Sequence, residues 1–137
     1  MINGVIAQKL QTLDEILNEL RSLGAVDATQ LKKDWRTQRA IERDLQVLVE
    51  VVIDICQRLI AIANQSPATT SSDAVERCIQ LGALSDDEAY RQMVRFRNFI
   101  VHRYDRIDVS ILVDVVMNRL SDFEQFRDEI LAHVKNN

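Results

Sequence analysis

The chain has 137 residues, a formal net charge of -4 at pH 7 and 47% hydrophobic residues, which fits one soluble globular domain over residues 1–137. It contains only three glycines and one proline, too few turn residues for a β-rich fold, so we expect an all-α protein. No apolar run is free enough of charge to span a membrane, and the N-terminus lacks the features of a signal peptide, so we expect a cytoplasmic protein.

Apolar residues at helical spacing predict an antiparallel bundle of about five helices. The first stripe runs from Ile6 to Leu20 and predicts a helix capped at Gly24. A second helix, the longest, should start after residues 27–29 and form the spine of the bundle. Its apolar stripe consists of Ile41, Leu45, Leu48, Val52, Ile55, Leu59 and Ile62. Residues 64–73 gather the only proline with serines and threonines, and predict a loop with an N-cap at Ser72 or Asp73.

Three more helices are expected in the second half of the chain. A short one runs to Gly82, and the residues from Ser85 to Glu88 match a capping box at the start of the next. The buried edge of that helix is predicted to be Ala89, Met93, Phe96 and Ile100. The last helix should begin near Asp108 and continue until it frays at residues 135–137.

Positive charge is concentrated between residues 91 and 106. Five arginines and one histidine stand there against a single acid, Asp105, although the whole chain is acidic. Non-specific nucleic-acid binders usually have a larger basic surface, so the pattern favours a small, focused site for a phosphate group. The alternative is that individual arginines pair with Glu88, Asp105, Asp108 or acids on a neighbouring helix.

The segment RNFIVHRY, residues 97–104, holds the strongest candidates for chemistry. Arg97 carries a planar cationic fork that suits phosphate, and His102 can exchange a proton near neutral pH. On a continuous helix Arg97 and Tyr104 would lie on nearly one face, with Asn98 and His102 one turn apart beside them. All four side chains could therefore line one cleft.

Arg-x4-His-x-Tyr near the end of a penultimate helix, in an all-helical chain of this length, resembles the HepT toxins of the HEPN superfamily. These are the ribonuclease partners of minimal nucleotidyltransferase antitoxins, and residues 39–61 also resemble their long second helix. The resemblance implies a HEPN-like bundle that forms a homodimer, in which the Arg-His motifs of two chains meet in one cleft. It further implies the toxin of a type VII toxin–antitoxin system, an endoribonuclease with RNA as its substrate and tRNA as one candidate.

Metal-independent RNA cleavage needs a base for the 2′-hydroxyl proton, an acid for the leaving 5′-oxygen and a cation for the charge that builds on phosphorus. In a dimer, His102 of one chain would act as base and that of the other as acid, while Arg97 would hold the phosphate. Asn98 would orient the histidine or bind a phosphate oxygen, and Arg95 and Arg103 would add contacts to RNA. No metal or other cofactor is expected. For a lone histidine, the simpler interpretation is a partly buried residue that satisfies a carbonyl at a helix end.

Tyr104 has two interpretations. In proteins that resemble this one, the cognate antitoxin transfers AMP from ATP to the tyrosine that follows the histidine, so Tyr104 is the candidate modification site. Each AMP would bring an anionic phosphate and a bulky base next to Arg97 and His102, and so exclude RNA. The alternative is a tyrosine that packs against the last helix and forms a hydrogen bond through its hydroxyl.

Other candidate residues have simpler interpretations. Glu50 and Asp54 lie one turn apart amid apolar neighbours, but no Glu-x-x-His companion exists, so we expect ion pairs rather than a metal site. Cys56 and Cys78 lack metal-ligand spacing and are expected to be reduced packing residues. We expect Trp35 to pack in the core or at an interface, and His133 to be a solvated residue near the C-terminus.

A second function remains open at this point. The same arginines would serve a non-catalytic HEPN-like module that binds a nucleotide or a partner transferase and cleaves nothing. Turnover of RNA separates this alternative from the ribonuclease.

Overall fold

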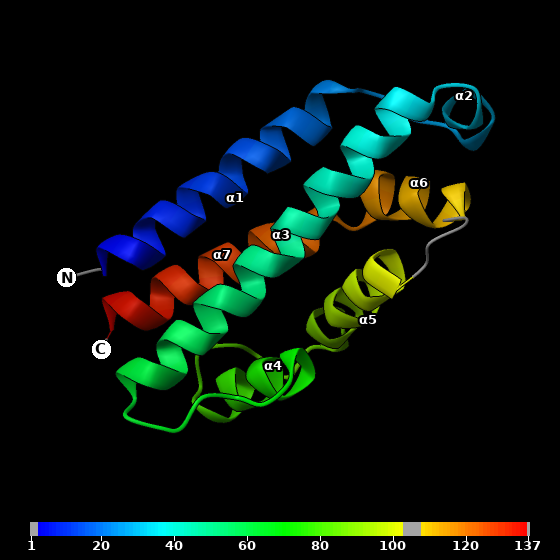
Figure 1. Ribbon diagram of the computed structural model, residues 1–137. Coiled ribbons are helices and arrows are strands. Elements are labelled where there is room, and N and C mark those ends of the chain that lie inside the picture. The colour runs from blue at the N-terminus through cyan, green and yellow to red at the C-terminus, as the bar shows by residue number, and fades with distance from the viewer. Residues whose placement is uncertain (1–2, 103–107, 137) are drawn as a thin grey trace.

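The computed structural model describes residues 3–102 and 108–136, without the side chains of residues 101 and 102. Within these ranges the chain is all-α, as expected (Figure 1). The helices are α1 (Gly4–Ser22), α2 (Ala28–Lys32), α3 (Trp35–Ile62), α4 (Ser71–Gln80), α5 (Glu88–His102), α6 (Val109–Asn118) and α7 (Leu120–Lys135).

The longest helix, α3, forms the spine of the bundle as predicted. It packs against α1, α2, α4, α5 and α6, and α7 packs against α1, α5 and α6 (Figure 1). The predicted stripe of α3 is buried from Ile41 to Leu59, whereas Ile62 at the last turn is 53% exposed. Burial of this stripe among five other helices is what holds the bundle together, because helical stability in proteins comes mainly from packing of the apolar face.

The predicted cap at Gly24 is confirmed. Gly24 follows the C-cap residue of α1 with φ of +69°, a left-handed conformation that glycine adopts without strain. The chain then forms the short helix α2, which was not predicted. Asp34 separates it from α3 by acting as N-cap, because its carboxylate accepts a hydrogen bond from the Thr37 amide at 3.1 Å.

Two predicted caps are wrong. The N-cap of α4 is Thr70 rather than Ser72 or Asp73, since the Thr70 hydroxyl accepts from the Asp73 amide at 3.0 Å. Ser85 does not cap α5, because its amide and hydroxyl donate to the Glu129 carboxylate on α7 at 2.7 and 2.9 Å. Ser85 therefore binds a residue that is distant in sequence instead of the start of α5. The Asp87 carboxylate accepts a hydrogen bond from the Ala89 amide in the first turn of α5.

The predicted last helix is divided in two. Asp108 caps α6 as expected, but the helix is interrupted at Arg119, where φ is -123° and ψ is 3°. The Arg119 side chain donates to Asp114 at 2.8 Å and to Gln92 of α5 at 2.6 Å, which stabilises the bend. The apolar spacing continues across the bend, so periodicity carries no signal for it. No helix in the described ranges is long and apolar enough to cross a membrane.

Candidate active site on α5

Helix α5 carries most of the candidate residues, and its inner face anchors it in the bundle. Tyr90 is completely buried; its hydroxyl accepts a hydrogen bond from Gln125 of α7 at 3.2 Å. Its ring meets Phe126 edge to face, with centroids 6.1 Å apart. Burial raises the pKa of Tyr90, so the phenol is neutral and works as a packing group with one polar contact.

Arg97 continues this inner face. It follows the buried residues Tyr90 and Val94 at helical spacing and is itself partly buried. Its Nε is fully shielded from solvent and has no hydrogen-bond acceptor among the described residues. Among the described residues, its guanidinium forms one long contact, from Nη1 to the Asn98 side-chain oxygen at 3.5 Å. Arg97 therefore retains donors for an anion such as a phosphate.

The outer face of α5 holds the second row of candidates. Arg95, Asn98 and position 102 follow one another at spacings of three and four residues, and Arg95 and Asn98 are exposed. His102 is the last residue of α5, so its backbone lies one turn beyond Asn98. The His102 side chain, Arg103 and Tyr104 lie outside the described residues, and their roles remain predictions.

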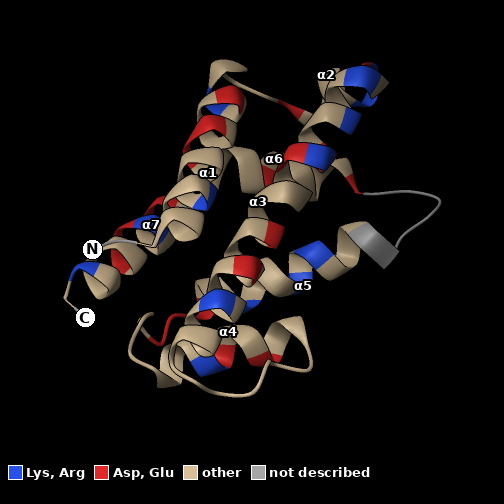
Figure 2. Ribbon diagram, turned by 60° about the vertical axis from the view of Figure 1, so that its left-hand side comes forward, with Lys and Arg blue, Asp and Glu red and all other residues tan. Residues whose placement is uncertain are grey.

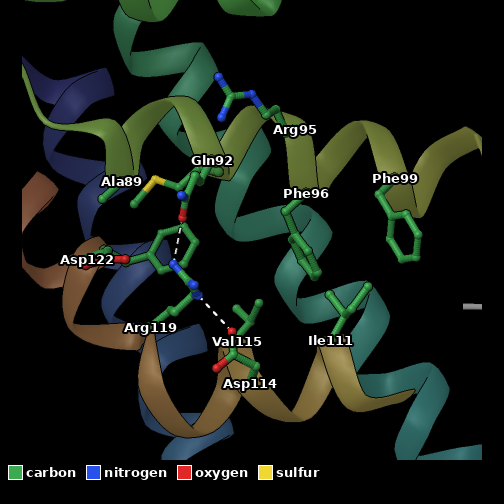
Figure 3. Close-up of a pocket in the computed structure, with 12 residues that line it drawn as sticks. Ala89, Gln92, Arg95, Phe96, Phe99, Ile111, Asp114, Val115, Arg119 and Asp122 are labelled. Carbon is green, nitrogen blue, oxygen red and sulfur yellow. Dashed lines mark hydrogen bonds and ion pairs between the residues drawn. The ribbon is translucent and has the colours of Figure 1, made fainter. Parts of the chain in front are cut away.

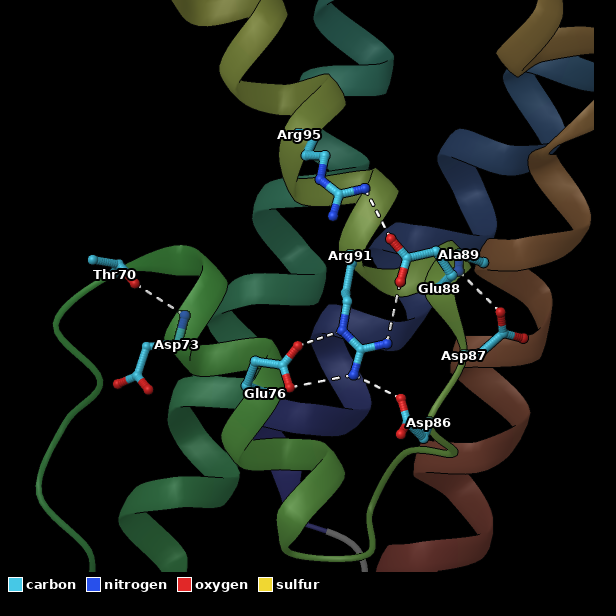
Figure 4. Close-up of polar contacts among 9 residues, drawn as sticks. All are labelled: Thr70, Asp73, Glu76, Asp86, Asp87, Glu88, Ala89, Arg91 and Arg95. Atoms are coloured by element: carbon cyan, nitrogen blue, oxygen red, sulfur yellow. Dashed lines mark hydrogen bonds and ion pairs between the residues drawn. The ribbon is translucent and has the colours of Figure 1, made fainter.

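Arg91 does not belong to the candidate site, because it joins α5 to α4 (Figure 4). It forms a close ion pair with Glu76 of α4 and further ion pairs with Asp86 at 2.6 Å and Glu88 at 3.3 Å. Hydrogen bonding to Arg91 lowers the pKa of Glu76, so the carboxylate stays ionised. Pairing with nearby acids, the alternative interpretation of the basic segment, is confirmed for Arg91.

Arg95 occupies an intermediate position. Its Nη1 lies 2.9 Å from the Glu88 carboxylate, while its side chain is 67% exposed (Figure 4). An exposed pair of this kind contributes little to stability and can be exchanged for a phosphate contact. The structure thus leaves Arg95 accessible to a ligand.

A cavity that the sequence did not indicate lies beside α5, and Arg95 is one of the residues that line it. It has a volume of about 440 Å³ between α5, α6 and α7, and Phe96, Phe99 and Phe123 form much of its apolar wall (Figure 3). Arg119 crosses one edge, with hydrogen bonds to Gln92 and Asp114. Its walls come from three helices, so no local motif could have revealed it. Arg97 does not line it.

The remaining candidates have structural partners. Glu50 accepts a hydrogen bond from Gln46 at 3.0 Å, and Asp54 pairs with Lys9 of α1 at 3.3 Å rather than with an arginine. Within the described ranges no group of three or more histidine, cysteine or acidic side chains could hold a metal ion.

Cys56 and Cys78 are both buried, which confirms that they pack in the core. Trp35 is 65% exposed, so its interpretation as a core residue is wrong. It is the first residue of α3, and its role at an interface is untested. His133 is partly buried rather than fully solvated.

Comparison with known proteins adds independent information. The family described as ribonuclease HepT-like matches residues 13–130. The chain is 29% identical over 133 residues to the mRNA nuclease HepT of Shewanella oneidensis, covering 96% of this chain and 99% of that protein. The solved structure of the tri-AMPylated Shewanella oneidensis HEPN toxin in complex with MNT antitoxin matches with a TM-score of 0.85 and 28% identity, over 96% of this chain and 99% of that one. A toxin–antitoxin structure with AMP-PNP also matches with a TM-score of 0.85 and 28% identity, over 95% of this chain and 99% of that one.

Proposed function

Since this chain belongs to the HepT-like ribonuclease family, we propose that it is the toxin of a type VII toxin–antitoxin pair and cleaves RNA without a metal ion. The observation that carries the proposal is the family match over residues 13–130, which includes the whole of α5. The Shewanella oneidensis relative is called an mRNA nuclease, which makes mRNA the first substrate to test and tRNA the second.

The chemistry we propose is an internal transfer at phosphorus. The ribose 2′-oxygen attacks the adjacent phosphorus while a base removes its proton, and the bond to the 5′-oxygen breaks as an acid supplies a proton to it. One strand then ends in a 2′,3′-cyclic phosphate and the other in a 5′-hydroxyl. His102 of one protomer acts as base and His102 of its partner as acid, which requires a homodimer.

Arg97 is proposed to bind the phosphate. Extra negative charge appears on the non-bridging oxygens when phosphorus becomes pentacoordinate, and a guanidinium fork can stabilise it with two parallel hydrogen bonds. The buried Nε of Arg97, without an acceptor among the described residues, supports this role. Asn98, whose side-chain oxygen faces Nη1 of Arg97 at 3.5 Å, helps to orient the guanidinium or binds a phosphate oxygen.

Control by a nucleotidyltransferase antitoxin completes the proposal. The solved relatives include a tri-AMPylated HEPN toxin in complex with MNT antitoxin. For this chain we assign the modification to Tyr104, two residues after His102. An AMP there places a phosphate and a base beside the site and so competes with RNA.

The proposal is tested by incubating purified, unmodified protein with mRNA and tRNA in excess EDTA. We expect cleavage, and we expect Arg97→Ala and His102→Ala each to lower the rate by at least about a hundredfold, as for other losses of acid–base or electrostatic catalysis. The matched controls are Arg58→Ala on the exposed face of α3 and His133→Ala on α7, which should cleave at the parental rate.

Circular dichroism must show that each variant remains helical. Full activity in folded Arg97→Ala and His102→Ala would contradict the site assignment. Loss of activity in EDTA would contradict the metal-independent mechanism and would direct attention to Glu50 and Asp54. Absence of cleavage by the parent protein, together with tight nucleotide or transferase binding, would support the non-catalytic alternative.

A further inference from the structure

A cluster of cations surrounds Trp35, where α2 ends and α3 begins (Figure 2). Trp35 is the most exposed large apolar side chain in the described residues and the only tryptophan in the sequence. We call this cluster the basic surface. It consists of Trp35 and five exposed cations, Lys32, Lys33, Arg36, Arg39 and Arg43.

The five cations lack close carboxylate partners, although the pKa of Asp34, lowered mainly by hydrogen bonds from Thr37, is also lowered by the charge of Arg36. In the part of the chain that the structure describes, none of them forms an ion pair. The two acids between residues 32 and 43 bind other groups: Asp34 accepts from the Thr37 hydroxyl at 2.6 Å, and Glu42 accepts from Gln38 at 3.4 Å. Arginines elsewhere do form ion pairs, among them Arg21, Arg77, Arg91, Arg119 and Arg127. Unpaired positive charge on an acidic protein is a local feature that fits an anionic partner.

The cations form a row. Arg36, Arg39 and Arg43 are spaced by three and four residues and therefore share one face of α3, over about 10 Å along its axis. Two lysines at the end of α2 extend the row. The opposite face of α3 is buried through Ile41 and Leu45, so the basic face is held in a fixed direction. A rigid row of this length can contact more than one phosphate of a nucleic-acid strand.

Trp35 adds an aromatic ring to the row. The Arg36 guanidinium carbon lies 5.4 Å from the centroid of the indole, a cation–π contact that helps to position the ring. Proteins that bind single-stranded nucleic acid combine cations along the backbone with aromatic rings on which bases stack. An acidic protein partner would account for the cations, but the exposed indole among them fits a nucleic-acid strand better, because every base offers a flat π face.

The basic surface is linked through α6 to the part of the fold that carries the candidate active site. Helix α2 packs against α6, and α6 is the first helix after the segment that carries Tyr104 (Figure 1). One RNA strand bound at the basic surface can therefore continue towards the end of α5. This arrangement would hold the substrate without taking part in the chemistry.

We infer that the basic surface binds the single-stranded RNA substrate, with a base stacked on Trp35 and phosphates bound by the surrounding cations. The inference rests on the proposed ribonuclease function and adds an RNA contact outside residues 97–104.

Binding to fluorescein-labelled, single-stranded RNA, followed by anisotropy over a range of salt concentrations, tests the inference. The double variant Arg36→Gln/Arg39→Gln should bind about tenfold more weakly at low salt, and its plot of log affinity against log salt should be less steep by about 1.4, two lost phosphate contacts at about 0.7 each. Trp35→Ala should also bind about tenfold more weakly, but with an almost unchanged slope, because stacking releases no counterions. The RNA affinity of Trp35→Phe should lie between that of Trp35→Ala and that of the parent.

The matched control is Lys9→Gln/Lys135→Gln. It removes the same charge from α1 and α7 near the two termini, at the end of the bundle away from α2 (Figure 1). Its affinity and salt slope should stay close to those of the parent. In the parent, RNA should also quench the fluorescence of Trp35, which reports contact at this residue directly.

Cleavage assays distinguish the inference from the proposed function. We expect the basic-surface variants to cleave long RNA more slowly at low substrate concentration, but a dinucleotide at the parental rate. Parental affinity and salt slope in these variants, with cleavage intact, would overturn the inference and leave the proposed function standing. Loss of antitoxin binding alone, with RNA binding unchanged, would assign the surface to a protein partner and also overturn it. A parent protein that neither binds nor cleaves RNA would overturn both.

Discussion

At the scale of single residues, Arg91 and Arg97 show how two half-buried arginines on one helix differ in their contacts. Arg91 lies among carboxylates of α4 and α5, and these contacts raise its pKa further above its ordinary value. Arg97 keeps a buried Nε without an acceptor among the described residues. An unsatisfied buried donor costs about 1–3 kcal/mol. Such a cost is typical of groups that a ligand satisfies, so Arg97 is the arginine of α5 best suited to hold a phosphate.

Tyr104 provides the residue-scale prediction. Co-expression with a nucleotidyltransferase antitoxin should place one or more AMP groups on Tyr104, and the modified protein should lose RNA cleavage, because a bound phosphate occupies the Arg97 fork. Tyr104→Phe should resist this silencing and keep most of its activity, since two histidines supply the proton transfers. Peptide mass spectrometry after co-expression measures the modification. Fully silenced protein with an unmodified Tyr104 would instead favour inhibition by antitoxin binding alone.

At the scale of elements, α1, α3 and α4 are each followed by a residue in the left-handed conformation. Gly82 follows α4 with φ of +79°, and the amides of Gly82 and Ala83 donate back to carbonyls of the last turn at 3.0 and 3.1 Å. Asn64 ends α3 in the same way, with φ of +59°. These turns let α3, α4 and α5 fold back on one another, which brings Arg91 next to its acidic partners Glu76, Asp86 and Glu88.

Three glycines give the element-scale prediction. Gly24→Ala and Gly82→Ala should each lower the free energy of unfolding by about 1 kcal/mol, because alanine is strained at positive φ. Gly4→Ala is the matched control: Gly4 lies in the first turn of α1 without positive φ, and an added Cβ meets no atom within 4 Å. It should be neutral or stabilise the protein by a few tenths of a kcal/mol. Urea titrations measure all three, and equal effects would contradict the argument from φ.

At the scale of the whole molecule, one histidine per chain in the catalytic motif is too few for the proposed chemistry. In the proposed mechanism a second protomer supplies the missing proton-transfer group, and a two-fold axis would place two copies of α5 near each other. The proposal therefore predicts that full activity requires a dimer and that the antitoxin would modify each copy of Tyr104 separately.

The dimer leads to a quantitative prediction. Light scattering on a sizing column should give twice the chain mass of 15.8 kDa. After subunit exchange with an equal amount of His102→Ala protein, the activity per parental chain should fall by about half, because only about a quarter of the dimers keep both histidines. Exchange with His133→Ala protein should cause no loss. A stable monomer with full activity at nanomolar concentration would contradict the shared site.

The correct sequence-based predictions depend on local physics. The 3.6-residue period revealed the stripes of α1 and α3, and the cap at Gly24 and the helix start next to Asp108 depend on residues within one turn. The predicted edge of α5 is only partly correct, because Met93 and Ile100 are buried whereas Ala89 and Phe96 are half-buried. The candidate site also came from spacing within one helix, which holds Arg97, Asn98 and His102, and it stays a prediction. Family membership agrees with that motif.

Two of the wrong predictions concern contacts between distant residues. The Ser85 hydroxyl, predicted to cap α5, donates a hydrogen bond to Glu129 of α7. The Arg119 side chain donates to Gln92 of α5 at the point where one continuous helix was expected. The packing of distant residues also decides which charges meet. Helices α1 and α3 bring Glu19 next to Asp44, where burial, a hydrogen bond that protonated Asp44 donates to Glu19, and repulsion between the two carboxylates raise the pKa of Asp44 to about 6.

By itself the sequence determined the helical class, the order of the main helices and the position of the candidate motif, because periodicity, capping and motif spacing are properties of neighbouring residues. Only the tertiary structure decided that Arg91 is paired, that Arg97 has a buried donor and that Trp35 is exposed among unpaired cations. These properties depend on which helices pack together, and the pattern within one helix does not record its neighbours.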